Sequence, residues 1–413
     1  MHLYEIPLIF VLIGLVLYTV LAGADFGAGF WQLFAGRGAS GARVREHAHE
    51  SIAPVWEANH VWLIFVLTVT WTAYPSAFGA IASTLSVPLF IAAIGIILRG
   101  AAYALRAGTA SAREQRSIDM VFAVSSILTP FALGTMVGAI AARRVPVGNA
   151  AGHLFSSWTG PVSLLVGVLA VATSAYLAAV FLAADAARLH ERALEHSFRT
   201  RALATGVLAG AVAIAGLVVL HADAHPLYHR LVRGDALAAL VVSILAGAAT
   251  LYLVAREHFE QARFSAALAV AAVIAGWALA QNPVLLPGLT VRQAAAPHDT
   301  LVVVVVAVLG GAVILLPSLA LLFRLVLGGR FDHGEHAPAP AAALRPLLSA
   351  SAPGLLARGA GACLLAGFGL LTIAEAGWAH ALGVLALLGF IVCGLFADIP
   401  AQLARIEHDD QYS

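Results

Sequence analysis

Lysine is missing from this chain of 413 residues, and charged residues of any kind make up only 11% of it. All the cationic side chains are therefore arginines, and they nearly balance the acidic residues, for a formal net charge of +1. Basic runs interleaved with aromatic residues, which would indicate nucleic-acid binding, do not occur. We therefore expect no nucleic-acid partner.

Cysteine is almost as scarce, and no metal-binding motif stands out. The two cysteines, Cys363 and Cys393, lie in apolar segments without CxxC spacing or paired histidines. His221, His225 and His229 recur near one another, but their spacing crosses a predicted helix break. We therefore predict no metal site, and interpret the cysteines as packing residues.

Apolar residues are what the chain has in abundance. They make up 61% of it, and the mean hydropathy of +0.90 is far above that of soluble domains and typical of multi-pass membrane proteins. A membrane-spanning helix needs about 20 apolar residues. Nine predicted spans of that kind lie at residues 6–34, 52–74, 77–106, 117–142, 158–186, 202–221, 236–255, 263–281 and 300–327. The first is too long for a signal peptide, so we expect it in the mature protein.

The C-terminal part has a different composition. A Pro/Ala-rich stretch at 331–354 predicts a flexible linker, and two shorter apolar spans follow at 355–374 and 378–398. We therefore predict an all-α polytopic membrane protein with about 11 transmembrane helices. Its predicted parts are a core at 1–330, the linker at 331–354, and a hairpin with a tail at 355–413.

Arginine placement predicts the orientation of these helices. If the N-terminus lies outside, the outer loops hold only Arg143, Arg144, Arg230, Arg233 and Arg292, while the remaining loops hold most of the other arginines. Because loops rich in positive charge stay in the cytoplasm, we expect the N-terminus outside and the C-terminus inside.

Two carboxylates lie inside apolar segments. Asp25 stands in Ala22–Trp31, among glycines and alanines that would let another helix approach closely. An aspartate at a helix centre costs about +2.5 to +3.5 kcal/mol on insertion scales, so it needs a reason. One interpretation places Asp25 near the helix end, in contact with interfacial water; the other places it against protein. The glycines and alanines favour contact with protein.

Glu57 is the second of these carboxylates. It stands in Ser51–Trp62, where Ser51 is a plausible helix N-cap and Pro54 fits the first turn. Asn59 is adjacent, and His60 shares a face of the predicted helix with Glu57. This polar cluster indicates a hydrated protein interior. The simplest interpretation of His60 is a packed, hydrogen-bonded histidine.

These motifs, together with Arg99, resemble subunit II of the cytochrome bd-type quinol oxidases, including the cyanide-insensitive branch. The motifs that carry the resemblance are Gly23–Gly29, Ser51–Trp62, Ser157–Gly160 and Gly276–Pro283. The resemblance covers about residues 1–330 and implies two four-helix bundles plus one peripheral helix. The two C-terminal spans have no counterpart in the family's pattern.

The resemblance also implies a function. In that family a larger subunit I carries haem b, haem d and the quinol-oxidising loop, whereas subunit II supports it and contributes to proton access. The family's acidic positions correspond to Asp25 and Glu57, and its arginine to Arg99. We therefore expect no haem bound by this chain, and proton uptake through both acids. A bound quinone and a small accessory subunit stay open.

The expected setting is the bacterial plasma membrane, with subunit I, quinol, oxygen and lipid as partners. Proton uptake suits buried acids, since oxygen reduction consumes protons that must cross low-dielectric protein. A proton-coupled transporter would also use such acids, although we see no pair of broken helices in two corresponding halves. A non-catalytic membrane scaffold, with Asp25 and Glu57 fixing helix packing, is a third class of function.

Overall fold

The computed structural model describes residues 2–36, 38–51, 56–106, 112–327, 355–372, 378, 382–390 and 393. They fall into two compact units, one with the described helices up to α13 and one with α16 and the residues after it. The predicted linker at 331–354 lies outside the described residues. The secondary structure of the first half is η1 (Leu3–Glu5), α1 (Ile6–Leu33), α2 (Gly38–Glu50), α3 (Trp56–Ala73), α4 (Pro75–Thr84), α5 (Ser86–Arg106), α6 (Ala112–Ala141) and α7 (Pro161–Arg188).

The remaining elements are again almost all helices. They are α8 (Arg192–Asp223), α9 (His225–Arg233), α10 (Leu237–Ala255), α11 (Phe259–Gln281), β1 (Val284–Leu286), β2 (Leu289–Thr290), α12 (Val291–Ala294), α13 (His298–Leu327) and α16 (Leu355–Thr372). The two short strands form an antiparallel hairpin. The described chain is therefore all-helical apart from this hairpin.

Eight described helices are long and apolar enough to cross a membrane: α1, α5, α6, α7, α8, α10, α11 and α13. Within α3, residues 59–73 form a shorter apolar helix. This confirms the predicted all-helical polytopic class, while the total of about eleven spans stays a prediction. It also places each predicted core span on a helix, although the bounds shift by several residues.

The predicted span 77–106 is wrong in one respect, because it is two helices. The short helix α4 ends at Thr84, Leu85 caps it, and α5 begins at Ser86. Pro88 explains the break, since its ring would collide with the carbonyl of Thr84 in a continuous helix and it has no N–H to donate. The Ser51 hydroxyl donates to Asp185 Oδ2 at 2.6 Å. Its predicted role as a helix cap stays a prediction, because residues 52–55 lie outside the described residues.

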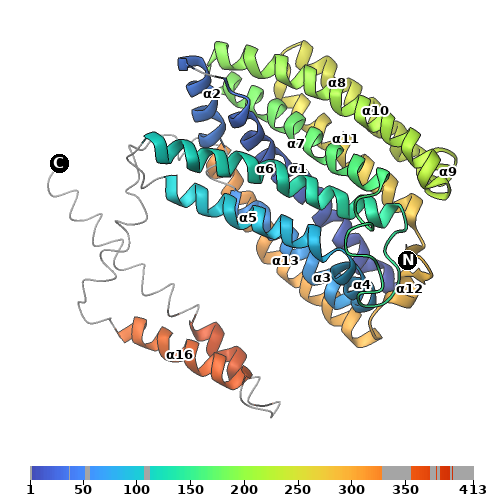
Figure 1. Ribbon diagram of the computed structural model, residues 1–413. Helices are drawn as coiled ribbons and strands as arrows, with labels where there is room; N and C mark the ends of the chain where they lie inside the picture. Colours follow the sequence, from blue (N-terminus) through green and yellow to red (C-terminus); the bar gives the residue numbers. More distant parts are fainter. Residues whose placement is uncertain are drawn as a thin grey trace. The chain divides into compact units, whose positions relative to one another are not determined.

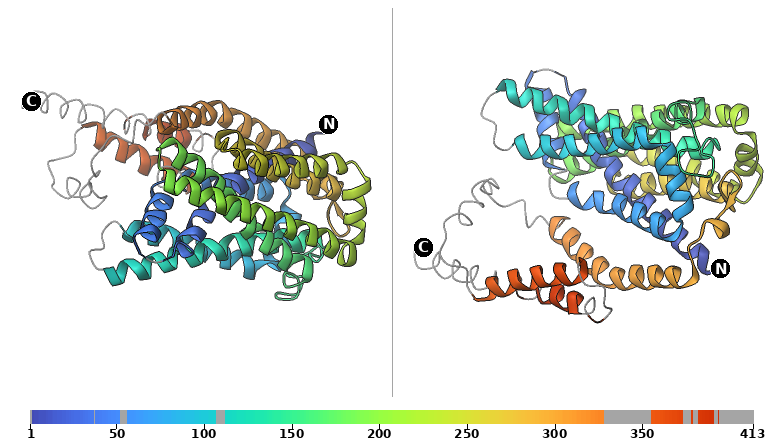
Figure 2. Two further views of the ribbon diagram at one scale, coloured as in Figure 1. Left: turned by 90° about the horizontal axis from the view of Figure 1, so that it is seen from above. Right: turned by 60° about the horizontal axis from the view of Figure 1, so that its bottom comes forward.

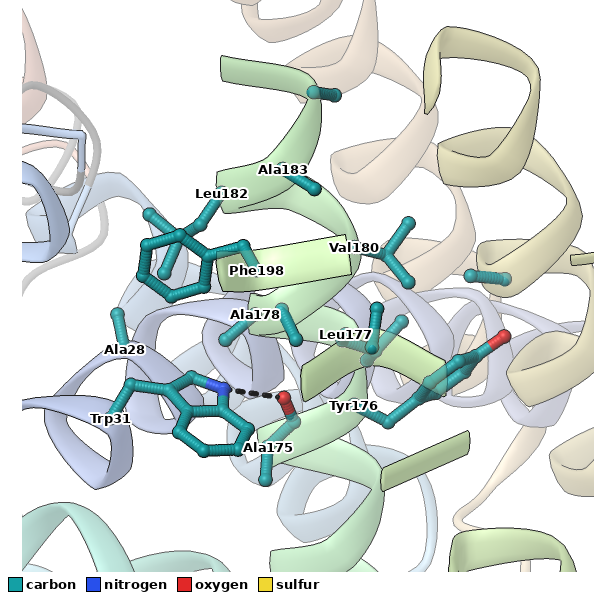
Figure 3. Close-up of a cluster of buried hydrophobic side chains, with 14 of the residues drawn as sticks. Ala28, Trp31, Ala175, Tyr176, Leu177, Ala178, Val180, Leu182, Ala183 and Phe198 are labelled. Carbon is teal, nitrogen blue, oxygen red and sulfur yellow. Dashed lines mark hydrogen bonds between the residues drawn. The ribbon is translucent and has the colours of Figure 1, made fainter. Parts of the chain in front are cut away.

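Helix α1 lies within the first unit, in contact with α2, α3, α6, α7 and α11 (Figure 1). The views in Figure 2 likewise show long helices of this unit running side by side. Small residues make the close contacts: a Cβ on Gly27 would collide with the backbone carbonyl of Ser174 in α7. Nearby, the indole of Trp31 donates to the carbonyl of Ala175 at 2.9 Å, within a core of alanines from α7 (Figure 3). Helix α1 is thereby fixed against α7.

The first unit has two ends with different elements (Figure 1). One end, here called the α2 end, holds α2, the C-termini of α1, α5 and α7, and the N-termini of α3, α6 and α8. The opposite end, here called the α9 end, holds α9, the β-hairpin and α12. Asp25 lies nearer to the α2 end, since it stands eight positions before the last residue of α1, Leu33.

The second unit contains α16 and a further helical stretch at 382–390. These two helices contact each other, because a Cβ on Gly367 would meet the side chain of Leu387 at 2.7 Å. Of the second predicted C-terminal span, 378–398, the structure describes residue 378, this stretch and residue 393. The rest of that span lies outside the described residues.

Candidate functional site

A buried ion pair joins the two predicted residues Asp25 and Arg99. Arg99 Nη2 lies 2.5 Å from Asp25 Oδ1, and the side chains are only 1% and 2% exposed for arginine and aspartate respectively. The same guanidinium nitrogen donates to the backbone carbonyl of Asp25 at 3.0 Å. Removing two charges from water is expensive, and only close pairing with additional hydrogen bonds offsets that cost. Asp25 therefore faces protein, as the glycines and alanines around it predicted.

Three helices build this ion pair. Arg99 lies on the buried face of α5, which repeats every three or four residues at Pro88, Ala92, Gly95, Arg99 and Ala102. On α6, the hydroxyl of Ser126 accepts a hydrogen bond from Arg99 Nη1. Gly29 of α1 is needed here, because a Cβ at that position would collide with the Ser126 hydroxyl. The pair therefore connects α1, α5 and α6.

Aromatic rings surround the guanidinium of Arg99. Its Cζ lies 5.2 Å from the ring centroid of Phe26 and 4.2 Å from that of Phe122. Such cation–π contacts stabilise a desolvated cation by about 2 kcal/mol. They also exclude water from one side of the ion pair. Phe122 and Ser126 were not predicted as site residues, because a phenylalanine and a serine in an apolar helix give no signal of their own.

Part of the carboxylate is left without a protein partner. Asp25 Oδ2 is buried and has no hydrogen-bond partner among the described residues, and the same holds for the hydroxyl of Tyr18. Tyr18 belongs to the same cluster, since its ring packs edge-on against Phe26 with centroids 6.4 Å apart. An unpaired buried oxygen costs about 1–3 kcal/mol, so such atoms are typical of sites that bind water or a proton.

The structure also brings the other predicted polar residues close to Asp25. The ring of His60 packs edge-on against those of Tyr18 and Phe26, with centroids 6.2 and 6.0 Å apart. Asn59 is buried, and its amide donates to the carbonyl of Leu21 at 3.4 Å. Glu57 belongs to the first turn of α3, but its side chain lies outside the described part of the structure.

The side chains of Tyr18, Phe26, Arg99 and Phe122 pack around Asp25, and the ring of His60 packs against two of them. Elsewhere in the described part of the chain, no group of three or more His, Cys, Asp or Glu side chains could hold a metal ion. The groups that the structure describes at this site include a buried carboxylate, its arginine partner and neighbouring hydroxyl groups.

Comparison with known proteins gives consistent matches. A family model described as cytochrome bd terminal oxidase subunit II matches residues 3–326. Over 169 residues, the chain is 28% identical to the Bacillus subtilis (strain 168) cytochrome bd ubiquinol oxidase subunit 2, covering 40% of this chain and 48% of that protein. It is also 28% identical to the Escherichia coli (strain K12) cytochrome bd-I ubiquinol oxidase subunit 2, covering 39% and 43%.

A solved structure, that of the bd oxidase from Geobacillus thermodenitrificans, is similar in fold. The TM-score is 0.63 and the identity 26%, and the match covers 79% of this chain and 99% of that chain. The match to each of the two curated relatives covers less than half of that relative's length. The family match and the shared fold therefore extend over most of the chain. The sequence identity to the two curated relatives extends over a shorter part of it.

Proposed function

The chain belongs to the cytochrome bd terminal oxidase subunit II family, and on this premise we propose that it works in a membrane complex that oxidises quinol and reduces oxygen to water. The match to the family model confirms the family predicted from the sequence. The complex would contain a haem-bearing subunit I, which holds haem b and haem d and supplies the redox chemistry. This chain would support that subunit and contribute to the supply of protons.

The observation that carries the proposal is the buried pair of Asp25 and Arg99. Oxygen reduction consumes protons, and a reaction centre within the membrane must receive them through titratable groups and water. Asp25 offers a carboxylate of which one oxygen is held by Arg99 and the other, Oδ2, has no described partner. Such an oxygen can accept a proton and pass it on. We propose the same role for Glu57 of α3, a helix that contacts α1.

The proposed orientation puts the α2 end in the cytoplasm, in a bacterial plasma membrane. The described arginines near this end include Arg43, Arg106, Arg188 and Arg192, whereas the opposite end holds fewer. Loops with more positive charge stay inside. Asp25 would then lie in the inner half of the membrane, on the side from which protons for oxygen reduction are drawn. The arrangement in two four-helix bundles with α3 as a ninth core span is part of the same proposal.

A structural role for Asp25 is the second candidate, and a specific observation favours it. The carboxylate and backbone of Asp25, bound by Arg99, hold α1 against α5 and α6 through one guanidinium. A scaffold would need only this pairing. The two roles differ in what happens when the carboxylate becomes an amide, which keeps an acceptor oxygen but loses the titratable proton.

The test is the double variant Asp25→Asn/Glu57→Gln in the whole complex, with Asp299→Asn as a matched control. Asp299 is fully exposed at the opposite end of the bundle, so its amide should change nothing. Proton uptake predicts normal assembly and haem content with slower quinol oxidation per complex, by about 10²-fold if the step is general acid–base transfer. Full turnover at full haem occupancy would refute the proposal, and loss of assembly alone would favour the scaffold.

A further inference from the structure

Polar side chains, with the ring of Phe122 among them, lie along the contact between α5 and α6. On α5, Arg99, Tyr103 and Arg106 follow at intervals of four and three residues, so they share one helix face. On α6, Asp119, Phe122 and Ser126 have similar spacing. The two faces meet, because Arg99 contacts Phe122 and Ser126 while Arg106 Nε lies 3.5 Å from Asp119 Oδ1. This set of residues is here called the α5–α6 file.

Exposure to solvent changes along the α5–α6 file. The Arg106 and Asp119 side chains, at the α2 end, are 27% and 26% exposed, whereas those of Arg99 and Asp25 are 1% and 2% exposed. The file therefore begins at a pair that water reaches and ends at the buried pair. Such a gradient is what a proton entrance requires, since a proton must leave bulk water and reach a group in the interior.

His49 of α2 covers the middle of the α5–α6 file. Its ring packs against that of Tyr103, with centroids 5.2 Å apart, and the side chain is half-buried. Tyr103 lies between the exposed and the buried pair. His49 therefore lies beside the stretch of the α5–α6 file that separates the exposed Arg106–Asp119 pair from the buried Arg99–Asp25 pair.

The surroundings of His49 keep it neutral. Burial, together with the positive charges of Arg106 and Arg99, lowers the pKa of His49 to about 4. The ring of Tyr103 packs against it, and the charges that act on it are those of Arg106 and Arg99 on α5; Arg106 is itself paired with Asp119 of α6. A neutral imidazole has one N–H donor and one acceptor nitrogen, so it can take a proton on one side and release another.

We propose that the α5–α6 file is the proton entrance of this chain and that His49 relays protons along it, from water at the Arg106–Asp119 pair toward Asp25. This rests on the proposed uptake of protons by Asp25. In each transfer, the acceptor nitrogen of His49 takes a proton from water. The opposite nitrogen then gives up its proton to a water or hydroxyl on the inner side. Ring rotation restores the first tautomer, so one proton enters and one leaves.

The test uses the whole complex with His49→Ala and His49→Phe, and His196→Ala as a matched control. His196 is another histidine near the α2 end, exposed on α8. We expect His49→Ala to assemble with normal haem content and to turn over about tenfold more slowly. The deficit should widen from about pH 6 to about pH 8, as protons become scarce, and added imidazole should restore the rate. The control should keep its rate.

The remaining outcomes separate a relay from packing. His49→Phe keeps a ring against Tyr103, so an assembled, slow His49→Phe complex supports the relay. Normal turnover of either variant, or a loss that imidazole and pH do not change, would overturn the inference. Failure of both variants to assemble would assign His49 to packing and overturn it too. Asp25→Asn and the double variant Asp25→Asn/Glu57→Gln are measured in parallel. If they are slow while His49→Ala is normal, only the entrance is wrong; if the double variant is normal, the proposed proton uptake itself fails.

Discussion

Loss of Arg99 should destabilise the protein far more than loss of a surface arginine. In Arg99→Leu, the Asp25 carboxylate would stay 2% exposed without its cation, and the carbonyl of Asp25 and the hydroxyl of Ser126 would lose a donor. Removing one partner of a buried ion pair costs about 3–5 kcal/mol. At about 1.4 kcal/mol per factor of ten, this lowers the ratio of folded to unfolded protein by roughly two to three and a half orders of magnitude.

A second substitution should return part of that stability. Asp25→Asn in the Arg99→Leu background replaces the stranded charge by a neutral amide, so we expect a recovery of about 2 kcal/mol or more. The surface pair of Arg144 and Asp223, 3.1 Å apart with side chains 35% and 27% exposed, is the matched control. Its Arg144→Leu variant should cost at most about 1 kcal/mol.

The assay is the yield of haem-containing complex from membranes, together with the temperature at which half of the purified complex loses its haem. The expected order is wild type, then the double variant, then Arg99→Leu, with Arg144→Leu close to wild type. If Arg99→Leu behaved like Arg144→Leu, the pair would not be buried as described. If the double variant were no better than Arg99→Leu, the loss would come from packing of the guanidinium and not from the stranded charge.

Three further predictions concern other parts of the chain. Expressed without its partner, the chain should be colourless, and a haem absorption band in stoichiometric amount would contradict this. Ending the chain near Gly334 should leave oxygen consumption largely intact, because the C-terminal spans lie outside the family match; an assembled but inactive truncated complex would show that they are needed. Gly27→Val should lower the yield of assembled complex by pushing α1 away from α7, whereas Gly210→Val, with no atom within 4 Å of its Cβ, should not, and equal yields would refute the close contact.

The helices were predictable from the sequence where burial in lipid decides them. Long apolar runs can satisfy their backbone groups only as helices, so α1 and α13 begin and end within two residues of the prediction. Helix α2 was missed, because Gly38–Glu50 is short and polar. It is stabilised by docking, with Val44 and Ala48 buried in the core beside α7. A helix that is stabilised mainly by tertiary contacts leaves little trace in the local composition of the sequence.

The site could be predicted only in part. Asp25 was found because a carboxylate in an apolar helix is costly and therefore rare. Arg99 came from the family resemblance, and its pairing with Asp25 depends on the rotation of α5 against α1, which the sequence does not encode locally. Ser126 and Phe122 carry no charge to mark them. They became visible only when α5 and α6 were placed against each other, with Arg99 between them.

The two proposed roles of Asp25 are compatible because its two carboxylate oxygens differ. Oδ1 is bound by Arg99, which also binds the Asp25 carbonyl, so this side holds the three helices together. Oδ2 has no described partner, so a proton could arrive there without breaking the contact to Arg99. A protonated Asp25 would leave the charge of Arg99 buried, stabilised only by Phe26, Phe122 and Ser126. That state should be short-lived, as proton transfer to the next group requires.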